Sequence, residues 1–286
     1  MEIININTCP LCGIKGISHK LFNKNSFSIV ECKNCGLSYV NPQPTKKFID
    51  NYYKENKKIW NSNEKEYPIS IYILKRIRKY VRNGDWLDIG CSEGHLLQVA
   101  KEKGFNVLGV ELNEEASRIA NSNGIKVLTE DFLRLSSEVK FNVVSMFRLF
   151  EHIGEPNSYL EKVGDVTVEN GILAISVPNY KFGIFIRKFT KKFSFLSSLE
   201  NSVNVFGPPS HLFHYSPLTM KEILERHGFY VFKIYNTYPT LERKGIVRNI
   251  LKLSCYLTSQ LIYFVSFKRV ILNYNFWIIA RKKQRS

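Results

Sequence analysis

The stretch Asp85–Leu97, DWLDIGCSEGHLL, is the segment around which the rest of the chain is organised. It opens with Trp86–Ile89, whose aromatic and aliphatic side chains are typical of a buried strand. Gly90 and Gly94 follow, and a helical pattern then runs to Gly104. The order of strand, glycine-containing turn and helix lets a ligand approach the backbone, where the free N–H groups of the helix start face it.

An acidic residue in the next unit narrows the class of ligand. The next strand, Val107–Val110, ends at Glu111, which lies 21 residues after Gly90. A carboxylate about 20 positions after such a turn suits the two hydroxyls of a ribose. The dinucleotide pattern G-x-G-x-x-G is excluded because Ser92 and His95 occupy its second and third glycine positions. A phosphate-binding P-loop is excluded because Gly-Lys-Ser/Thr is missing there.

Strands separated by single helices continue through the chain and predict a parallel, doubly wound α/β sheet. Ligands of such sheets bind beyond the carboxyl ends of the strands, where we place Glu111, Asp131, Phe147 and Asn179. The expected strands after the turn are Val107–Glu111, Ile125–Thr129, Phe141–Met146 and Gly171–Val177.

Two C-x₂-C pairs precede this domain and predict a metal site. Cys9 and Cys12 form one pair, Cys32 and Cys35 the other, and each pair is followed by a glycine that permits a tight turn. Four thiolates at this spacing favour a closed tetrahedral zinc site without an open position, so we interpret it as structural. Metal binding would supply folding energy that a module of about 35 residues lacks.

Composition restricts the cellular setting and the partners. The chain of 286 residues has a formal net charge of +16, from 41 basic and 25 acidic residues. Met1–Thr8 lacks the basic start and apolar core of a signal peptide, so we expect a cytoplasmic protein with few disulfides. The excess charge is local: residues 181–193 carry five basic residues, residues 243–286 carry ten, and neither stretch has an acid.

The run Leu87–Gly94 resembles the first motif, D-x-G-x-G-x-G, of class I S-adenosylmethionine-dependent methyltransferases. Asp88, Gly90 and Gly94 match its outer positions, and Ser92 replaces the middle glycine. The resemblance implies a seven-stranded, mostly parallel Rossmann-like sheet that binds S-adenosylmethionine. The cofactor-binding residues that it implies are Asp88, Gly90, Cys91, Gly94, Glu111, Asp131 and Phe147, of which Asp131 would meet the adenine amino group.

Further segments extend the resemblance to residues 85–283. The run from Phe147 to His152 is similar to a loop that ends in Leu-Glu-His in the family, with Phe150 in place of that Leu. Pro178-Asn179, the His-containing run 211–217 and the final strand 275–281 also have counterparts. The chain most resembles the subset that carries an N-terminal zinc ribbon and modifies sugars, polysaccharides and small metabolites.

These features divide the chain into three parts. We predict a zinc ribbon at residues 1–41, a helical linker or cap at 42–84, and a methyltransferase domain at 85–286. Insertions are expected at about 181–210 and 241–270. In the linker, Thr45 would cap a first helix and Pro68 would start a second.

Histidines are the candidates for acceptor chemistry, since an imidazole titrates near neutrality and can take a hydroxyl proton. We favour His211 as the base, and then His152, for which a structural role in its loop is equally open. A metal site formed by His211 and His214 is not favoured, because no further ligand lies nearby in sequence. Glu151 is interpreted as a structural carboxylate and Cys91 as a small filler.

Two basic-apolar stretches could contact a membrane surface. Residues 181–199 interleave Phe and Ile with basic residues, and 245–267 carry an apolar helical face. Packing against the core or a second subunit is the default, and contact with an anionic lipid surface or a phosphate-bearing acceptor is the alternative. The longest uncharged run, 253–267, has 15 residues, fewer than the about 20 that span a bilayer.

The sequence therefore predicts methyl transfer from S-adenosylmethionine to a small molecule, sugar or glycan, with oxygen as the favoured atom. An RNA methyltransferase and a non-catalytic module that joins a zinc ribbon to a cofactor-binding domain are the alternatives. Ser92, Arg148 and Phe150 are the departures that would favour the non-catalytic module. A peripheral position at the inner membrane face would fit a lipid-linked glycan acceptor.

Overall fold

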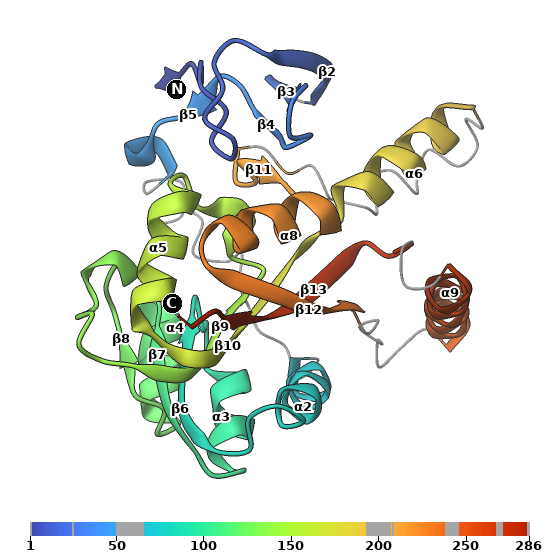
Figure 1. The fold of residues 1–286 in the computed structure, drawn as a ribbon. Coiled ribbons are helices and arrows are strands. Elements are labelled where there is room, and N and C mark those ends of the chain that lie inside the picture. Colours follow the sequence, from blue (N-terminus) through green and yellow to red (C-terminus); the bar gives the residue numbers. More distant parts are fainter. Residues whose placement is uncertain are drawn as a thin grey trace.

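A seven-stranded sheet forms the centre of the molecule (Figure 1). The computed structural model describes residues 2–24, 26–49, 66–192, 207, 209–237, 246–266 and 271–284. The sheet order is β12-β13-β10-β9-β6-β7-β8; neighbours from β10 to β8 run parallel, and β13 is antiparallel to β10 and β12. The predicted mostly parallel, doubly wound sheet is confirmed. Its strands are β6 (Gly84–Ile89), β7 (Phe105–Val110), β8 (Val127–Leu128), β9 (Phe141–Phe147), β10 (Thr167–Pro178), β12 (Phe229–Asn236) and β13 (Asn275–Lys282).

Helices cover both faces of this sheet and bury its alternating side chains. On one face, Trp86 and Trp277 pack with apolar residues of α2, α3 and α4. On the other face, Leu87 and Ile278 pack with α5 and α8. This two-sided burial explains the near-continuous apolar runs of the central strands. The helices are α2 (Glu66–Ile77), α3 (His95–Lys101), α4 (Glu114–Ser122), α5 (Pro156–Val166) and α8 (Pro217–Arg226).

Helix starts follow the capping signals of the sequence. Asn113 caps α4 by accepting the backbone N–H of Ala116 at 2.9 Å, as its position predicts. Helix α2 begins at Glu66 rather than at Pro68, because a proline in the first turn has no intrahelical partner to lose. Thr45 accepts the N–H of Phe48 at 3.3 Å at the start of a helical turn, and the rest of that expected helix lies outside the described residues.

The N-terminal module shares a sheet with the main domain. Strands β2 (Ser18–Lys24), β3 (Phe27–Cys32) and β4 (Ser38–Val40) form an antiparallel ladder. The two-residue strand β11 (Phe213–His214) pairs with β4 and completes the order β11-β4-β3-β2. Across the boundary expected at residue 41, β5 (Gln43–Pro44) pairs back with β1 (Ile3–Ile4).

Two further helices stand away from the central sheet. Helices α6 (Tyr180–Lys192) and α9 (Ile246–Val265) lie on the right in Figure 1, α6 beside the N-terminal module and α9 beyond the β12 edge. Helix α9 agrees with the helix expected at 245–267, whereas residues 193–199 of the basic stretch lie outside the described residues. Among the described helices, none combines the length and the apolarity that spanning a bilayer requires.

Candidate functional site

The turn after β6 has the backbone that a close ligand approach requires. Gly90 and Gly94 have φ of 70° and 78°, and Ser92 between them has φ of 51°. Positive φ is uncommon outside glycine, so Ser92 adopts the strained conformation that the middle glycine of the motif takes without cost. The turn is held to β7 by a hydrogen bond from the N–H of Gly90 to the carbonyl of Val110, at 2.7 Å.

Glu111 lies directly beside this turn. Its Oε2 accepts the N–H of Ser92 at 2.9 Å, and its Oε1 accepts the N–H of Asn113 at 2.8 Å. These bonds fix the carboxylate between the turn and the start of α4, and each oxygen has a further lone pair for a hydroxyl donor. This pair of acceptor oxygens therefore fits the hydroxyl groups of the ribose of an adenosyl group.

Asp88, two residues before Gly90, stabilises the strand that leads into the turn through buried hydrogen bonds. The side chain is buried and accepts the hydroxyl of Ser145 at 2.5 Å, while Ser145 in turn accepts the indole N–H of Trp86 at 2.8 Å. This buried chain connects β6 to β9 beneath the turn. Asp88 thus fits a positioning role better than direct contact with a ligand, and Ser145 is a partner that the sequence reasoning missed.

Cys91 fills space beside a glycine of β7. The thiol is buried, and burial raises its pKa above the usual range. A β-carbon built on Gly109 would lie 2.5 Å from Sγ of Cys91, so only glycine fits opposite this cysteine. The geometry agrees with the interpretation of Cys91 as a filler, because an inert, protonated thiol is a poor nucleophile.

Asp131 connects three elements beyond β8. It caps the short 3₁₀ helix η2 (Phe132–Arg134) by accepting the N–H of Leu133 at 3.1 Å, and it accepts the hydroxyl of Tyr159 at 3.1 Å. Lys46 forms an ion pair with the other carboxylate oxygen at 3.5 Å. Tyr159 and Lys46 belong to α5 and the linker, and neither carried a sequence signal for this role.

The loop after β9 contacts the turn at Gly90–Gly94. Phe147 is half-buried beside Trp277, with ring centroids 6.0 Å apart. A β-carbon built on Gly90 would lie 3.1 Å from the side chain of Leu149, so the loop and the turn are in close contact. Arg148 has a positive φ of 56°, and its N–H donates to the carbonyl of Ser176 in β10 at 2.9 Å.

A polar cluster around the buried Glu151 follows in the same loop. Glu151 and His152 lie in the 3₁₀ helix η3 (Phe150–His152), and their Oε1 and Nε2 atoms are 3.8 Å apart. The His152 and His211 rings are in edge contact, with centroids 4.8 Å apart. Burial raises the pKa of Glu151 to about 8, and burial together with His211 lowers the pKa of His152 to about 3. The structure thus brings together both histidines that the sequence singled out.

The segment after His211 is buried against the N-terminal module. Burial lowers the pKa of His214 to about 3, and burial together with Glu151 raises the pKa of Tyr215. The ring of Tyr215 stacks on Phe150 with a centroid distance of 5.2 Å. His214 therefore belongs to the core at the β11–β4 ladder, and only His211 of the H-x₂-H pair faces the cluster around Glu151.

The four cysteines of the N-terminal module converge as the sequence predicts. All four sulfurs lie within 4.8 Å of one another, with Cys9 and Cys35 at 3.5 Å and Cys12 and Cys32 at 3.7 Å. Four sulfurs around zinc, each about 2.3 Å from the ion, would be about 3.8 Å apart. The geometry of the thiol set therefore fits a tetrahedral zinc ion.

Polar contacts tie this module to the main domain. The N–H of Val40 donates to the carbonyl of Leu212 at 2.9 Å, which extends the β4–β11 ladder. Asn157 of α5 donates to the carbonyl of Pro10 at 2.8 Å, and Arg226 of α8 donates to that of Leu11 at 3.2 Å. The cysteine turn is thereby held against the same two helices that cover one face of the sheet.

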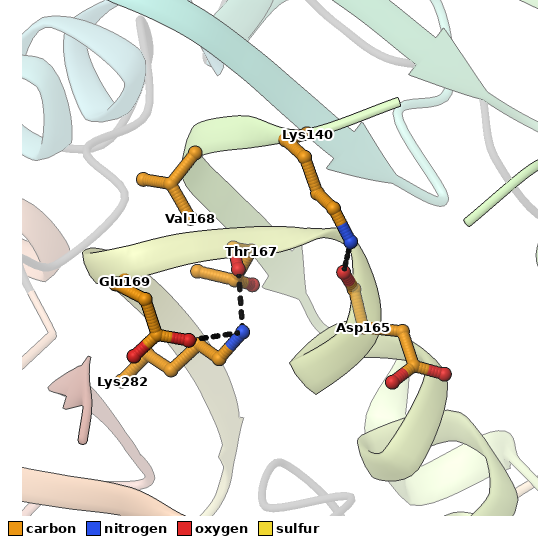
Figure 2. A pocket seen from close by; sticks show the side chains of 6 residues that line it. All are labelled: Lys140, Asp165, Thr167, Val168, Glu169 and Lys282. Carbon is orange, nitrogen blue, oxygen red and sulfur yellow. Dashed lines mark hydrogen bonds and ion pairs between the residues drawn. The ribbon is translucent and has the colours of Figure 1, made fainter. Parts of the chain in front are cut away.

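A pocket lies at the end of the sheet where the parallel strands β9 and β10 begin. Figure 2 shows its lining residues around the start of β10 and the end of β13. Lys282 there bonds the carbonyl of Thr167 at 2.8 Å and pairs with Glu169 at 3.1 Å, while Lys140 bonds the carbonyl of Asp165. Both lysines already bond to protein groups, and the turn at Gly90–Gly94 lies at the opposite ends of the parallel strands. This pocket is therefore separate from the site.

Comparison with known proteins agrees with this geometry. The profile of the family described as "Methyltransferase domain" matches residues 66–234, more than half of the chain. The ubiquinone biosynthesis O-methyltransferase of Rickettsia akari is 25% identical over 177 residues, 56% of this chain and 70% of that protein. The enzyme of the same name from Glaesserella parasuis is 29% identical over 105 residues, and that match spans 44% of its length and 32% of this chain.

Solved structures share the fold at low sequence identity. Magnesium protoporphyrin IX methyltransferase from Synechocystis, with bound S-adenosylhomocysteine, superposes with a TM-score of 0.55 at 12% identity, covering 84% of this chain and all of that one. An S-adenosylmethionine-dependent methyltransferase from Archaeoglobus fulgidus gives 0.53 at 21% identity, with 81% and 99% covered. Together with the matched profile and the turn beside Glu111, these findings show that the chain belongs to the methyltransferase-domain family and is an S-adenosylmethionine-dependent methyltransferase of Rossmann-like fold.

Proposed function

We propose that the enzyme methylates a hydroxyl oxygen of a small molecule, sugar or glycan. The observation that carries this proposal is the cluster of the buried Glu151 with the half-buried His152 and His211, of which Glu151 and His152 lie in the loop that contacts the turn at Gly90. A hydroxyl is a weak nucleophile that gains from loss of its proton, so a polar cluster at this position favours oxygen as the target. The names of the curated relatives, which are O-methyltransferases, support the same choice.

We assign cofactor binding to the residues around the turn. The backbone from Gly90 to Gly94 would face the methionine part, and Glu111 would bind the ribose hydroxyls. Asp131 would accept from the adenine amino group with the oxygen that faces Lys46, and Phe147 would line the entrance. Asp88 and Cys91 would shape the turn from beneath.

S-adenosylmethionine supplies an electrophilic methyl group, whose carbon–sulfur bond breaks with the electron pair kept on sulfur while the oxygen–carbon bond forms. The protein aligns the acceptor oxygen and removes its proton. His211 is the first candidate for the proton acceptor, and His152 is the second. With its pKa lowered to about 3, His152 is neutral at physiological pH and is a weak base.

Turnover of a His211→Ala variant tests this assignment. We expect unchanged affinity for S-adenosylhomocysteine by calorimetry, because His211 lies outside the turn, and a loss of methyl transfer of about 100-fold or more. His227→Ala is the matched control, since that histidine follows the last residue of α8 and its side chain bonds to the carbonyl of Ile223, away from the cluster. An acceptor panel of sugars, phenols, glycans and RNA identifies the substrate. Methylation of RNA alone, or unchanged turnover of His211→Ala, would contradict the proposal.

We further propose one structural zinc ion on Cys9, Cys12, Cys32 and Cys35. The sulfur spacing supports it, and so does the position of the cysteine turns between the module and the main domain. A four-thiolate site has no open position for a substrate, so its effect on methyl transfer would be indirect.

An anionic membrane surface is the partner that we propose for α9. Five apolar residues of this helix are exposed on one stripe: Ile250, Leu253, Leu257, Leu261 and Phe264. The opposite side is anchored, since the Tyr263 hydroxyl donates to the carbonyl of Ile234 at 2.7 Å. The stripe lies within residues 243–286, which carry ten basic residues and no acidic residue. An exposed apolar surface next to basic residues fits a membrane surface with negatively charged lipid headgroups.

A further inference from the structure

The polar cluster of the proposed active site also has the composition of a metal centre. Glu151 and His152 of η3 and His211, which precedes β11, each offer one ligand atom, and the three atoms lie within 4.8 Å of one another. The sequence alone does not favour a metal at His211 and His214, because no third ligand lies nearby in the chain. The fold supplies two from the loop after β9, while His214 is turned into the β11–β4 core.

Glu151 provides an independent sign of a missing partner. Its side chain is 2% exposed, and its Oε2 makes no hydrogen bond to any described residue. A buried carboxyl oxygen without a hydrogen-bond partner is uncommon in folded proteins and points to a proton, a donor or a cation at this position. A cation between the carboxylate and the two imidazoles would be such a partner.

The tautomer of His152 is the one that a metal ligand needs. Its Nδ1 lies 2.9 Å from the carbonyl oxygen of Ser210, which can only accept, so Nδ1 carries the proton. Nε2 therefore keeps its lone pair, and this atom is the one 3.8 Å from Oε1 of Glu151. Metal-bound histidines commonly donate their second ring N–H to a carbonyl in this way.

We propose that Glu151, His152 and His211 bind one divalent transition-metal ion of the zinc and manganese class. Two imidazoles and one carboxylate suit these ions and leave an open position for a further ligand. Ligand atoms about 2.1 Å from a tetrahedral ion would be about 3.4 Å apart, so Oε1 and Nε2 need to approach by only a few tenths of an ångström. Arg148, whose charge reaches both Glu151 and His152, opposes the ion.

The ion would change how the acceptor loses its proton. A hydroxyl bound at the open position has a lowered pKa and can release its proton to solvent, so His211 acts as a ligand in the loaded enzyme and as a base only without the ion. This role rests on the proposed O-methylation, whereas binding of the ion itself does not.

Manganese binding to the full-length protein with zinc in its cysteine site tests the proposal. Loss of the free Mn²⁺ signal in electron paramagnetic resonance should show one bound Mn²⁺ per chain. Glu151→Gln and His211→Ala should each weaken binding by about 10- to 100-fold. Arg148→Gln should strengthen it, because a repelling charge is removed. His227→Ala should leave it unchanged.

Two fold checks keep the outcome clear. Each variant should keep one zinc per chain by elemental analysis and an unchanged affinity for S-adenosylhomocysteine. No Mn²⁺ binding to the folded protein, or Mn²⁺ binding by Glu151→Gln and His211→Ala that is as tight as binding by the unsubstituted protein, would overturn the metal site. If an acceptor is methylated under those conditions, the proposed function stands alone; if Mn²⁺ binds as expected and no hydroxyl acceptor is methylated, only the metal site stands.

Discussion

Glu111 is the residue on which cofactor affinity is expected to depend most. Its two oxygens accept backbone N–H groups from the turn and from the start of α4, so the carboxylate is already placed before a ligand arrives. In Glu111→Gln the amide nitrogen cannot accept, and the charge is lost. We expect the affinity for S-adenosylhomocysteine to fall by about 1.5–3 kcal/mol, measured by calorimetry. Glu114→Gln, an exposed change at the start of α4, should leave it unaltered.

Gly109 is a second residue whose role the structure makes testable. An alanine there would place its β-carbon 2.5 Å from Sγ of Cys91 and 3.0 Å from Val127. We expect Gly109→Ala to lower the free energy of unfolding by about 1–3 kcal/mol in urea denaturation, the usual cost of overpacking. Adding Cys91→Ala removes the nearest atom and should recover part of this loss. Equal stability of the single and double variants would contradict the contact.

Residues of the cofactor turn could be predicted from the sequence because their spacing along the chain fixes them. Gly90 and Gly94 follow β6, and Glu111 follows β7, which is the next strand in the chain and also the neighbour of β6 in the sheet. Residues at this sequence spacing are therefore also close in space. Ser145 could not be found in this way, since its bond to Asp88 depends on the pairing of β6 with β9. Tyr159, which bonds Asp131, depends likewise on how α5 packs beside η2.

At the scale of elements, α9 shows both the reach and the limit of sequence periodicity. The apolar spacing predicted the helix and its stripe, but not which side the protein covers. That side is set by Tyr263 and the buried Ser259, which face the sheet and leave the apolar stripe exposed. A two-residue strand such as β11 gives no pattern at all, because its pairing with β4 comes entirely from tertiary structure.

The exposed stripe of α9 leads to a membrane-binding prediction. We expect the protein to float with phosphatidylglycerol vesicles at low salt and not with phosphatidylcholine vesicles. Leu257→Ser with Leu261→Ser should reduce the bound fraction severalfold, because it removes apolar area from the stripe. Leu218→Ser with Val139→Ser, which removes exposed apolar side chains elsewhere, is the matched control. Dimers that dissociate in the α9 variant, without any flotation of the parent protein, would assign the stripe to self-association.

At the scale of the whole molecule, the N-terminal module and the main domain behave as one packed unit. Buried Cys9, Leu11 and Cys32 belong to the same apolar cluster as Met220 and Leu224 of α8. This explains why a boundary drawn from composition alone misses the coupling. The cysteine pairs predict a separate metal module. In the structure, however, β4 of that module pairs with β11, the short strand that follows His211.

Loss of the metal from the cysteine site should therefore act on methyl transfer through β11. Cys35→Ser removes one thiolate and loosens the turn that precedes β4, so the amides at Val40 and in 211–216 should exchange faster with deuterium. The central strands β6 and β9 and the turn at Gly90 do not depend on that ladder, so their protection and the affinity for S-adenosylhomocysteine should stay. Turnover should fall because His211 is no longer held against His152. Unchanged exchange in 211–216 together with unchanged turnover would show that the module folds beside the active site without positioning it.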